Sequence, residues 1–131
     1  MRVIPIVAAM LAGSAAFADT LGLYRDKSRV IVASAPSADD PALQRQRAIF
    51  AAMGRHARSR DLVLVEAVGD GAEAQALRTA FGIDAHNFTA VLVGKDGGAK
   101  LRATHPLDAA ALFPVIDAMP MRRQERRERG E

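Results

Sequence analysis

The 131-residue sequence contains no cysteine, no tryptophan and a single tyrosine. Without cysteine, the chain has no thiol nucleophile, no dithiol redox pair, no disulfide and no cysteine metal site. The scarcity of aromatic side chains argues against nucleic-acid binding, because such proteins stack bases on aromatic rings interleaved with basic residues. We therefore expect a domain that is held together by its apolar core and that binds no nucleic acid.

Histidine and acidic residues do not occur at the spacings that metal sites and catalytic sites require. His56, His86 and His105 are scattered along the chain, with neither i,i+4 pairing nor a neighbouring ligand. Asp40 directly precedes Pro41, so helix capping explains this carboxylate without a bound cation. The sequence indicates no metal site, no cofactor and no catalytic residue, and we expect the protein not to be an enzyme.

Residues 1–18 are typical of a signal peptide. Arg2 gives the positive start, residues 4–17 form an apolar run, and Ala16–Ala18 has the small-x-small pattern of a cleavage site. The run is short and is interrupted by proline and glycine, so we expect no stable membrane span after its removal, a retained anchor being the alternative. Cleavage after Ala18 predicts a periplasmic or secreted protein that begins at Asp19.

Apolar runs alternate with amphipathic stretches along the rest of the chain. Strands are expected at 29–35, 61–68, 88–93 and 99–103, and helices from the Asp40 cap to Ser59, from the Asp70 cap to Gly82 and over 106–118. Asp70 and Glu73 resemble a capping box at the start of the second helix. In the last helix, Pro114 should produce a kink or mark the real start, and Pro120 should end the helix.

The order of these elements predicts the fold. Two early strands joined by a helix favour a parallel pair, and the turn Lys95–Gly98 favours antiparallel pairing of the last two strands. The order β-α-β-α-β-β-α predicts an α/β domain over residues 19–121, a thioredoxin-like three-layer sandwich with a mixed four-stranded sheet. Residues 122–131 hold five arginines and three glutamates, and we expect them to form a basic, frayed tail.

A redox activity does not fit this version of the scaffold. Residues 35–40 lie where a thioredoxin-type enzyme carries its cysteines, and they contain two acids and no sulfur. Phe88 and Thr89 stand where the active fold has a proline before its third strand. The sequence therefore argues against thiol exchange and peroxide reduction.

One group of polar and basic residues remains as a candidate binding site. Gln46 falls on the apolar face of the first helix, and a buried amide needs hydrogen-bond partners. If the hairpin and the last turn pack together, their cations form a patch suited to an anionic ligand or partner: Lys95, Lys100, Arg102, Arg122 and Arg123. In the alternative, which the usual behaviour of basic clusters favours, Asp96 and Asp117 neutralise these cations and Gln46 bonds to the backbone.

Several short segments together resemble one known family. They are Asp39-Asp40 with Gln46, Arg60–Val63, Val93–Gly98 with Lys100–Arg102, and Ile116–Glu125. The combination resembles an exported bacterial domain family of unknown function with a cysteine-free, thioredoxin-like fold. It is similar to the repeated domains of a vertebrate extracellular-matrix protein, the coiled-coil-domain protein also called down-regulated by oncogenes. The resemblance covers about residues 21–127, and it implies this fold and export but no established activity.

These observations support one main functional hypothesis and two alternatives. The main hypothesis is an exported, non-catalytic thioredoxin-like domain that binds an unknown protein or an anionic envelope component. The first alternative is a non-redox enzyme with a polar pocket at the start of the first helix, formed by Asp40, Gln46 and Lys95. It requires these three side chains to converge on a cavity. The second alternative is a structural envelope protein.

Overall fold

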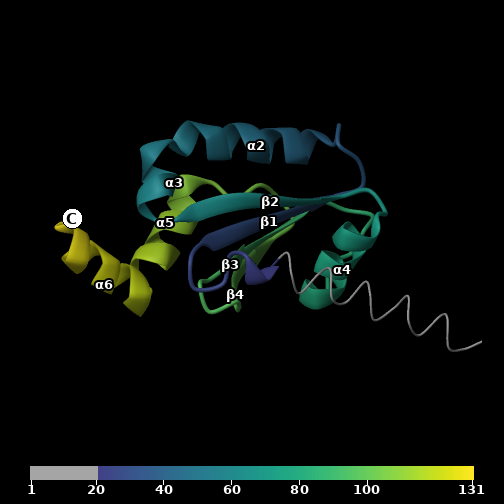
Figure 1. Ribbon diagram of the computed structural model, residues 1–131. Helices are drawn as coiled ribbons and strands as arrows, with labels where there is room; N and C mark the ends of the chain where they lie inside the picture. Colours follow the sequence, from purple (N-terminus) through teal and green to yellow (C-terminus); the bar gives the residue numbers. More distant parts are fainter. Residues whose placement is uncertain (1–20) are drawn as a thin grey trace, which may run out of the picture.

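The computed structural model describes residues 21–131, so the predicted signal peptide lies outside the described residues (Figure 1). The strands are β1 (Arg29–Ala35), β2 (Leu62–Val68), β3 (Thr89–Val93) and β4 (Ala99–Ala103). The helices are α2 (Pro41–Met53), α3 (Arg55–Ser59), α4 (Ala72–Phe81), α5 (Ala109–Asp117) and α6 (Pro120–Arg129). The positions of all four strands agree with the sequence-based prediction to within one residue at each end.

The four strands form one mixed sheet in the order β2-β1-β3-β4. β1 is parallel to β2, with Ile31 opposite Leu64, and antiparallel to β3. β3 and β4 form the predicted antiparallel hairpin, which is irregular at Leu92 and Val93. All residues of β1 and β3 are buried, which explains their continuous apolar sequences. The parallel pair and the antiparallel hairpin are both confirmed.

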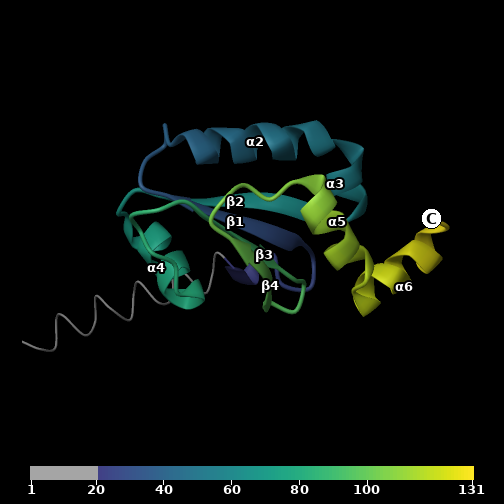
Figure 2. The same cartoon turned by 180° about the vertical axis from the view of Figure 1, so that it is seen from behind.

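Helices cover both faces of this sheet, as Figures 1 and 2 show. On one face, Ile31 and Leu92 pack in a core cluster with Leu43 of α2 and Leu112 of α5. On the other face, a smaller cluster joins alternate strand residues to the segment after α4 and to the N-terminal lead: Val30, Val32, Val91, Val93, Ile83 and Tyr24. This three-layer arrangement is the expected thioredoxin-like α/β sandwich.

Two predictions about helix ends were wrong. The first helix does not run unbroken to Ser59, because Gly54 takes a left-handed φ of 53° and separates α2 from α3. The capping box at Asp70 does not form, because Gly71 occupies the N-cap position and no side chain caps α4. At its other end α4 stops as predicted, at Gly82 in the left-handed conformation.

The C-terminal segment differs most from its prediction. α5 begins after its Asp108 cap and contains Pro114, and Pro120 is the first residue of α6 instead of a stop. Residues 122–129 continue α6, so the expected frayed tail is wrong. Arg122 is only 3% exposed, because one face of α6 packs against the domain. Within residues 21–131, no helix combines the length and apolar character that crossing a membrane requires.

Candidate functional site

A buried ion pair joins α6 to the amino end of β1. Arg29 is fully buried, and its Nη1 and Nη2 donate to the two carboxylate oxygens of Glu125 at 3.0 and 3.1 Å. Nη1 also donates to the carbonyl of Arg60 at 2.9 Å, and Nε lies 3.4 Å from the sulfur of Met119. This fork geometry satisfies both oxygens of one carboxylate and fixes the orientation of α6.

Lys95 extends this pair into a network. Its Nζ donates to Glu125 Oε2 at 2.7 Å and to Asp61 Oδ2 at 2.8 Å, and Arg129 also donates to Asp61 at 2.8 Å. Burial disfavours the charged form of Glu125, but hydrogen bonds from Arg29 and Lys95 outweigh it and hold the pKa of this carboxyl below its ordinary value. Burial likewise opposes ionisation of Asp61, and Lys95 and Arg129 nevertheless lower its pKa.

A second cluster fastens the junction of α5 and α6 to the end of α3. Arg60 donates to both oxygens of Asp117 at 3.0 and 2.9 Å, and its guanidinium lies 3.8 Å from the ring centre of Phe113. Arg122 is 3.4 Å from Asp117 and donates to the carbonyl of Ser59 at 2.8 Å. Burial opposes ionisation of Asp117, but Arg60 and Arg122 lower its pKa overall.

The structure does not gather the predicted cations into one open patch. Lys95 and Arg122 are buried in the two clusters above. Lys100 pairs with Asp96 at 2.8 Å, and Arg102 donates to the backbone carbonyls of Phe81 and Gly82. Of the five predicted cations, only Arg123 forms neither an ion pair nor a side-chain hydrogen bond within the described chain, and its side chain is exposed. The alternative in which acids neutralise most of these cations is therefore the one that the structure supports.

Asp40 and Gln46 have structural partners of their own. Asp40 caps α2, and its carboxylate accepts from the backbone N–H groups of Ala42 and Leu43. Gln46 is fully buried, and its amide donates to Leu107 O at 2.9 Å and accepts from Leu107 N at 2.8 Å. Asp40, Gln46 and Lys95 thus do not converge on a cavity.

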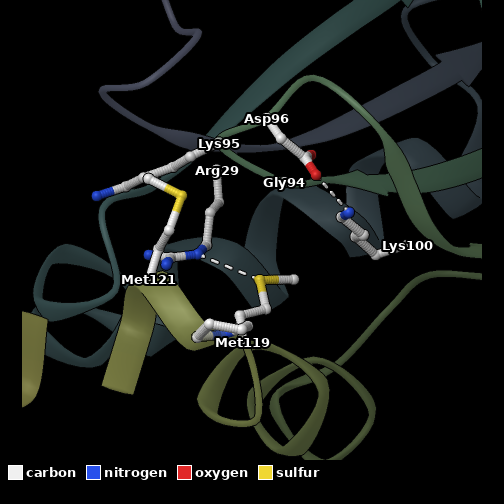
Figure 3. A pocket seen from close by; sticks show the side chains of 8 residues that line it. Arg29, Gly94, Lys95, Asp96, Lys100, Met119 and Met121 are labelled. Carbon is white, nitrogen blue, oxygen red and sulfur yellow. Dashed lines mark hydrogen bonds and ion pairs between the residues drawn. The ribbon is translucent and has the colours of Figure 1, made fainter. Parts of the chain in front are cut away.

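A cavity of about 220 Å³ lies beside the first ion-pair network (Figure 3). Met119, Pro120 and Met121 form much of its wall, and the hairpin contributes Lys100 and Asp96. Arg29 and Lys95 also line it, but their charges are already matched by acids. The cavity therefore offers methionine surface and an internal ion pair, with no free nucleophile or base.

The outer face of α6 carries cations that the domain does not neutralise. Arg123, Arg126 and Arg127 are exposed, and in residues 21–131 none of them has an ion-pair partner. Their i, i+3, i+4 spacing places them on one side of the helix. Arg122 and Glu125 are also three positions apart, and they lie on the face of the helix that packs against the domain. That periodicity was the available sequence signal for an ordered, two-sided helix, and it was missed.

A second buried arginine, Arg78 of α4, was also missed. It is 5% exposed, and its Nε donates to Ser34 Oγ at 2.9 Å. Its Nη1 and Nη2 donate to the carbonyls of Gly69, Ala35 and Ala67. No carboxylate within the described part of the chain lies at ion-pair distance from it. The local sequence does not indicate that Arg78 is buried, because a basic residue near the end of a helix is usually exposed.

The fold and this geometry define a mixed α/β domain whose C-terminal helix is fastened by buried ion pairs. The chain belongs to the family described as a domain of unknown function, DUF4174, whose family model matches residues 20–125. The matched range includes Glu125, the carboxylate that pairs with Arg29 and Lys95. The expectation of a domain of unknown function is thereby confirmed. Among residues 21–131, no group of three or more potential ligands is arranged to hold a metal ion.

Proposed function

We propose that this chain is an exported, non-catalytic domain that binds an anionic surface of the cell envelope through the outer face of α6. The observation that carries the proposal is the unpaired cationic triad Arg123, Arg126 and Arg127, displayed on a helix whose inner face is ion-paired to the domain. The triad replaces the larger patch that the sequence suggested, of which only Arg123 is retained.

The inner face of α6 makes the triad suitable for binding. Glu125 and Arg122 fix the helix through buried contacts, so the three cations are held on a rigid element before any partner arrives. A basic residue near an anionic membrane surface contributes roughly 1 kcal/mol of attraction. Since the inner face is occupied, the helix would lie against an anionic surface without inserting an apolar face into it.

The surroundings of the cavity support a non-catalytic role. Its only amines belong to Lys95, which meets two acids, and Lys100, which pairs with Asp96. A nucleophile needs an adjacent base that activates it, and no such pair is found among the lining residues. The alternative enzyme required Asp40, Gln46 and Lys95 to meet in one pocket, and each has a different structural partner.

Vesicle binding tests the proposal. The chain from Asp19 onward is mixed with phosphatidylglycerol or phosphatidylcholine vesicles and sedimented. We expect binding to the anionic vesicles alone, weakened by salt and at least tenfold weaker in the R123Q/R126Q/R127Q variant, from roughly 1 kcal/mol per lost cation.

The matched control removes three other exposed arginines, in R45Q/R55Q/R58Q, which changes the net charge equally. We expect this control to bind nearly as well as the unmodified chain. Equal weakening by both triple variants would show that net charge alone drives binding. Insensitivity of vesicle binding to salt and to the α6 substitutions would also overturn the proposal.

A further inference from the structure

A hollow of about 570 Å³ lies at the carboxyl ends of β1 and β2, away from α6. Pro36 follows β1, Gly69 and Asp70 follow β2, and α4 with the connector after it completes the wall. β1 leads into α2 on one face of the sheet, whereas β2 leads into α4 on the opposite face (Figures 1 and 2). In open α/β sheets, ligands bind in the crevice outside two adjacent strand ends whose connections diverge in this way.

Arg78 lies against this hollow with an uncompensated charge. Four of the five N–H groups of its guanidinium have acceptors, all of them neutral oxygens, and the remaining Nη1 hydrogen has none in the described structure. A buried cation without an acidic partner is costly, and neutral dipoles compensate it only in part. The site therefore retains a positive potential and one donor for an incoming anion.

The other lining residues narrow the class of ligand. Thr79 supplies a hydroxyl, and Pro36, Ile83 and Ala85 supply apolar surface. Asp70 is the one acid among the lining residues, and its exposed carboxylate opposes an anion without pairing with Arg78. We propose that the hollow binds a small organic oxyanion, a carboxylate or phosphate monoester with a compact apolar body, with the anionic group at Arg78. This site is separate from the outer face of α6.

Calorimetric titration tests the site with three probes that share a six-carbon chain: hexanoate, hexyl phosphate and the neutral 1-hexanol. We expect saturable binding of at least one anion and none of the alcohol, and the preferred anion distinguishes a carboxylate site from a phosphate site. The Asp70→Asn variant should bind that anion about fivefold more tightly, because a nearby like charge is removed. Glu128→Gln on α6 makes the same change in net charge and should leave the affinity unchanged.

Arg78→Gln should abolish binding, with circular dichroism used to check that the variant folds. If it does not fold, the gain in Asp70→Asn decides the question, since that side chain is exposed. Absence of anion binding by both the unmodified chain and Asp70→Asn would overturn the proposal, as would equal affinities in the two. The R123Q/R126Q/R127Q variant should bind the probes normally, so failure here and failure of vesicle binding are distinguishable.

Discussion

A buried arginine lies at each end of β1, and the two arginines differ in the charge of their hydrogen-bond partners. At the amino end, Arg29 meets the carboxylate of Glu125 in a two-pronged pair, and Lys95 shares the same acid. At the carboxyl end, Arg78 meets only backbone carbonyls and the hydroxyl of Ser34 beside an open hollow. Burial alone therefore does not distinguish a structural arginine from one that can bind a ligand. The presence or absence of an acidic partner distinguishes them.

This difference has a direct electrostatic consequence. A buried cation that is paired with a buried anion presents little net field to solvent. The network around Arg29 therefore stabilises the position of α6 but exerts little attraction on a charged ligand. A buried cation held by neutral dipoles keeps its charge, so the field at Arg78 extends into the hollow. We therefore assign a structural role to the paired end and a binding role to the unpaired end.

The largest expected effect comes from breaking the paired end. Arg29→Met should lower the free energy of unfolding by about 3–5 kcal/mol, because it leaves Glu125 buried with one fewer partner and frees the carbonyl of Arg60. Urea denaturation measures the change. The double variant Arg29→Met/Glu125→Leu should lose less than the sum of the two single losses. Strictly additive losses would mean that the pair is not coupled.

Gln46 is a buried polar residue without charge, so its replacement measures the cost of lost hydrogen bonds apart from that of a lost ion pair. Gln46→Leu should cost about 2 kcal/mol or more, since the N–H and C=O of Leu107 both lose their partner in the core. Gln44→Leu is the matched control, and we expect it to change stability by less than about 0.5 kcal/mol because Gln44 is exposed. Thermal and urea unfolding of both variants would check this, and similar stabilities would contradict the role given to Gln46.

The smallest effect is the response to acid, which should arise at the paired end. The pKa of Glu125 is below its ordinary value of 4.5 in the folded chain, so its contribution is complete above that pH and is lost as the pH falls through the lower, folded value. Asp61 and Asp117, with lowered pKa values of their own, add to this loss from 3.8 downward. Unfolding curves between pH 7 and 3 measure it, and Glu125→Leu should flatten the profile. An unchanged profile in that variant would count against the assignment.

Sequence patterns were sufficient for the parts of the fold that local chemistry determines. The β-branched run of β1 and the glycine turn between β3 and β4 were predicted because burial and turn geometry are encoded within a few residues. The Asp40 cap before Pro41 was predicted for the same reason. The break at Gly54 was missed, because a helix interior tolerates glycine unless tertiary packing selects its left-handed conformation.

The candidate sites were harder to predict, because their contacts join residues far apart in the chain. Arg29 and Glu125 are separated by 96 positions, and nothing local to either residue reveals the partner. The arginine-rich end of the chain has the composition of a solvated tail, and the buried ion pairs of its inner face are formed only in the folded domain. Arg78 joins the ends of β1 and β2, which only the folded sheet brings together.

The contrast between the two arginines can be measured in one experiment, by following their side-chain Nε–Hε signals by NMR during titration with hexanoate. Arg78→Lys and Arg29→Lys variants assign the signals. We predict that the Arg78 signal shifts with saturation, whereas the Arg29 signal, held between Glu125 and the backbone, stays in place. A shift of the Arg29 signal with a stationary Arg78 signal would contradict the assignment of binding to the unpaired end of the sheet.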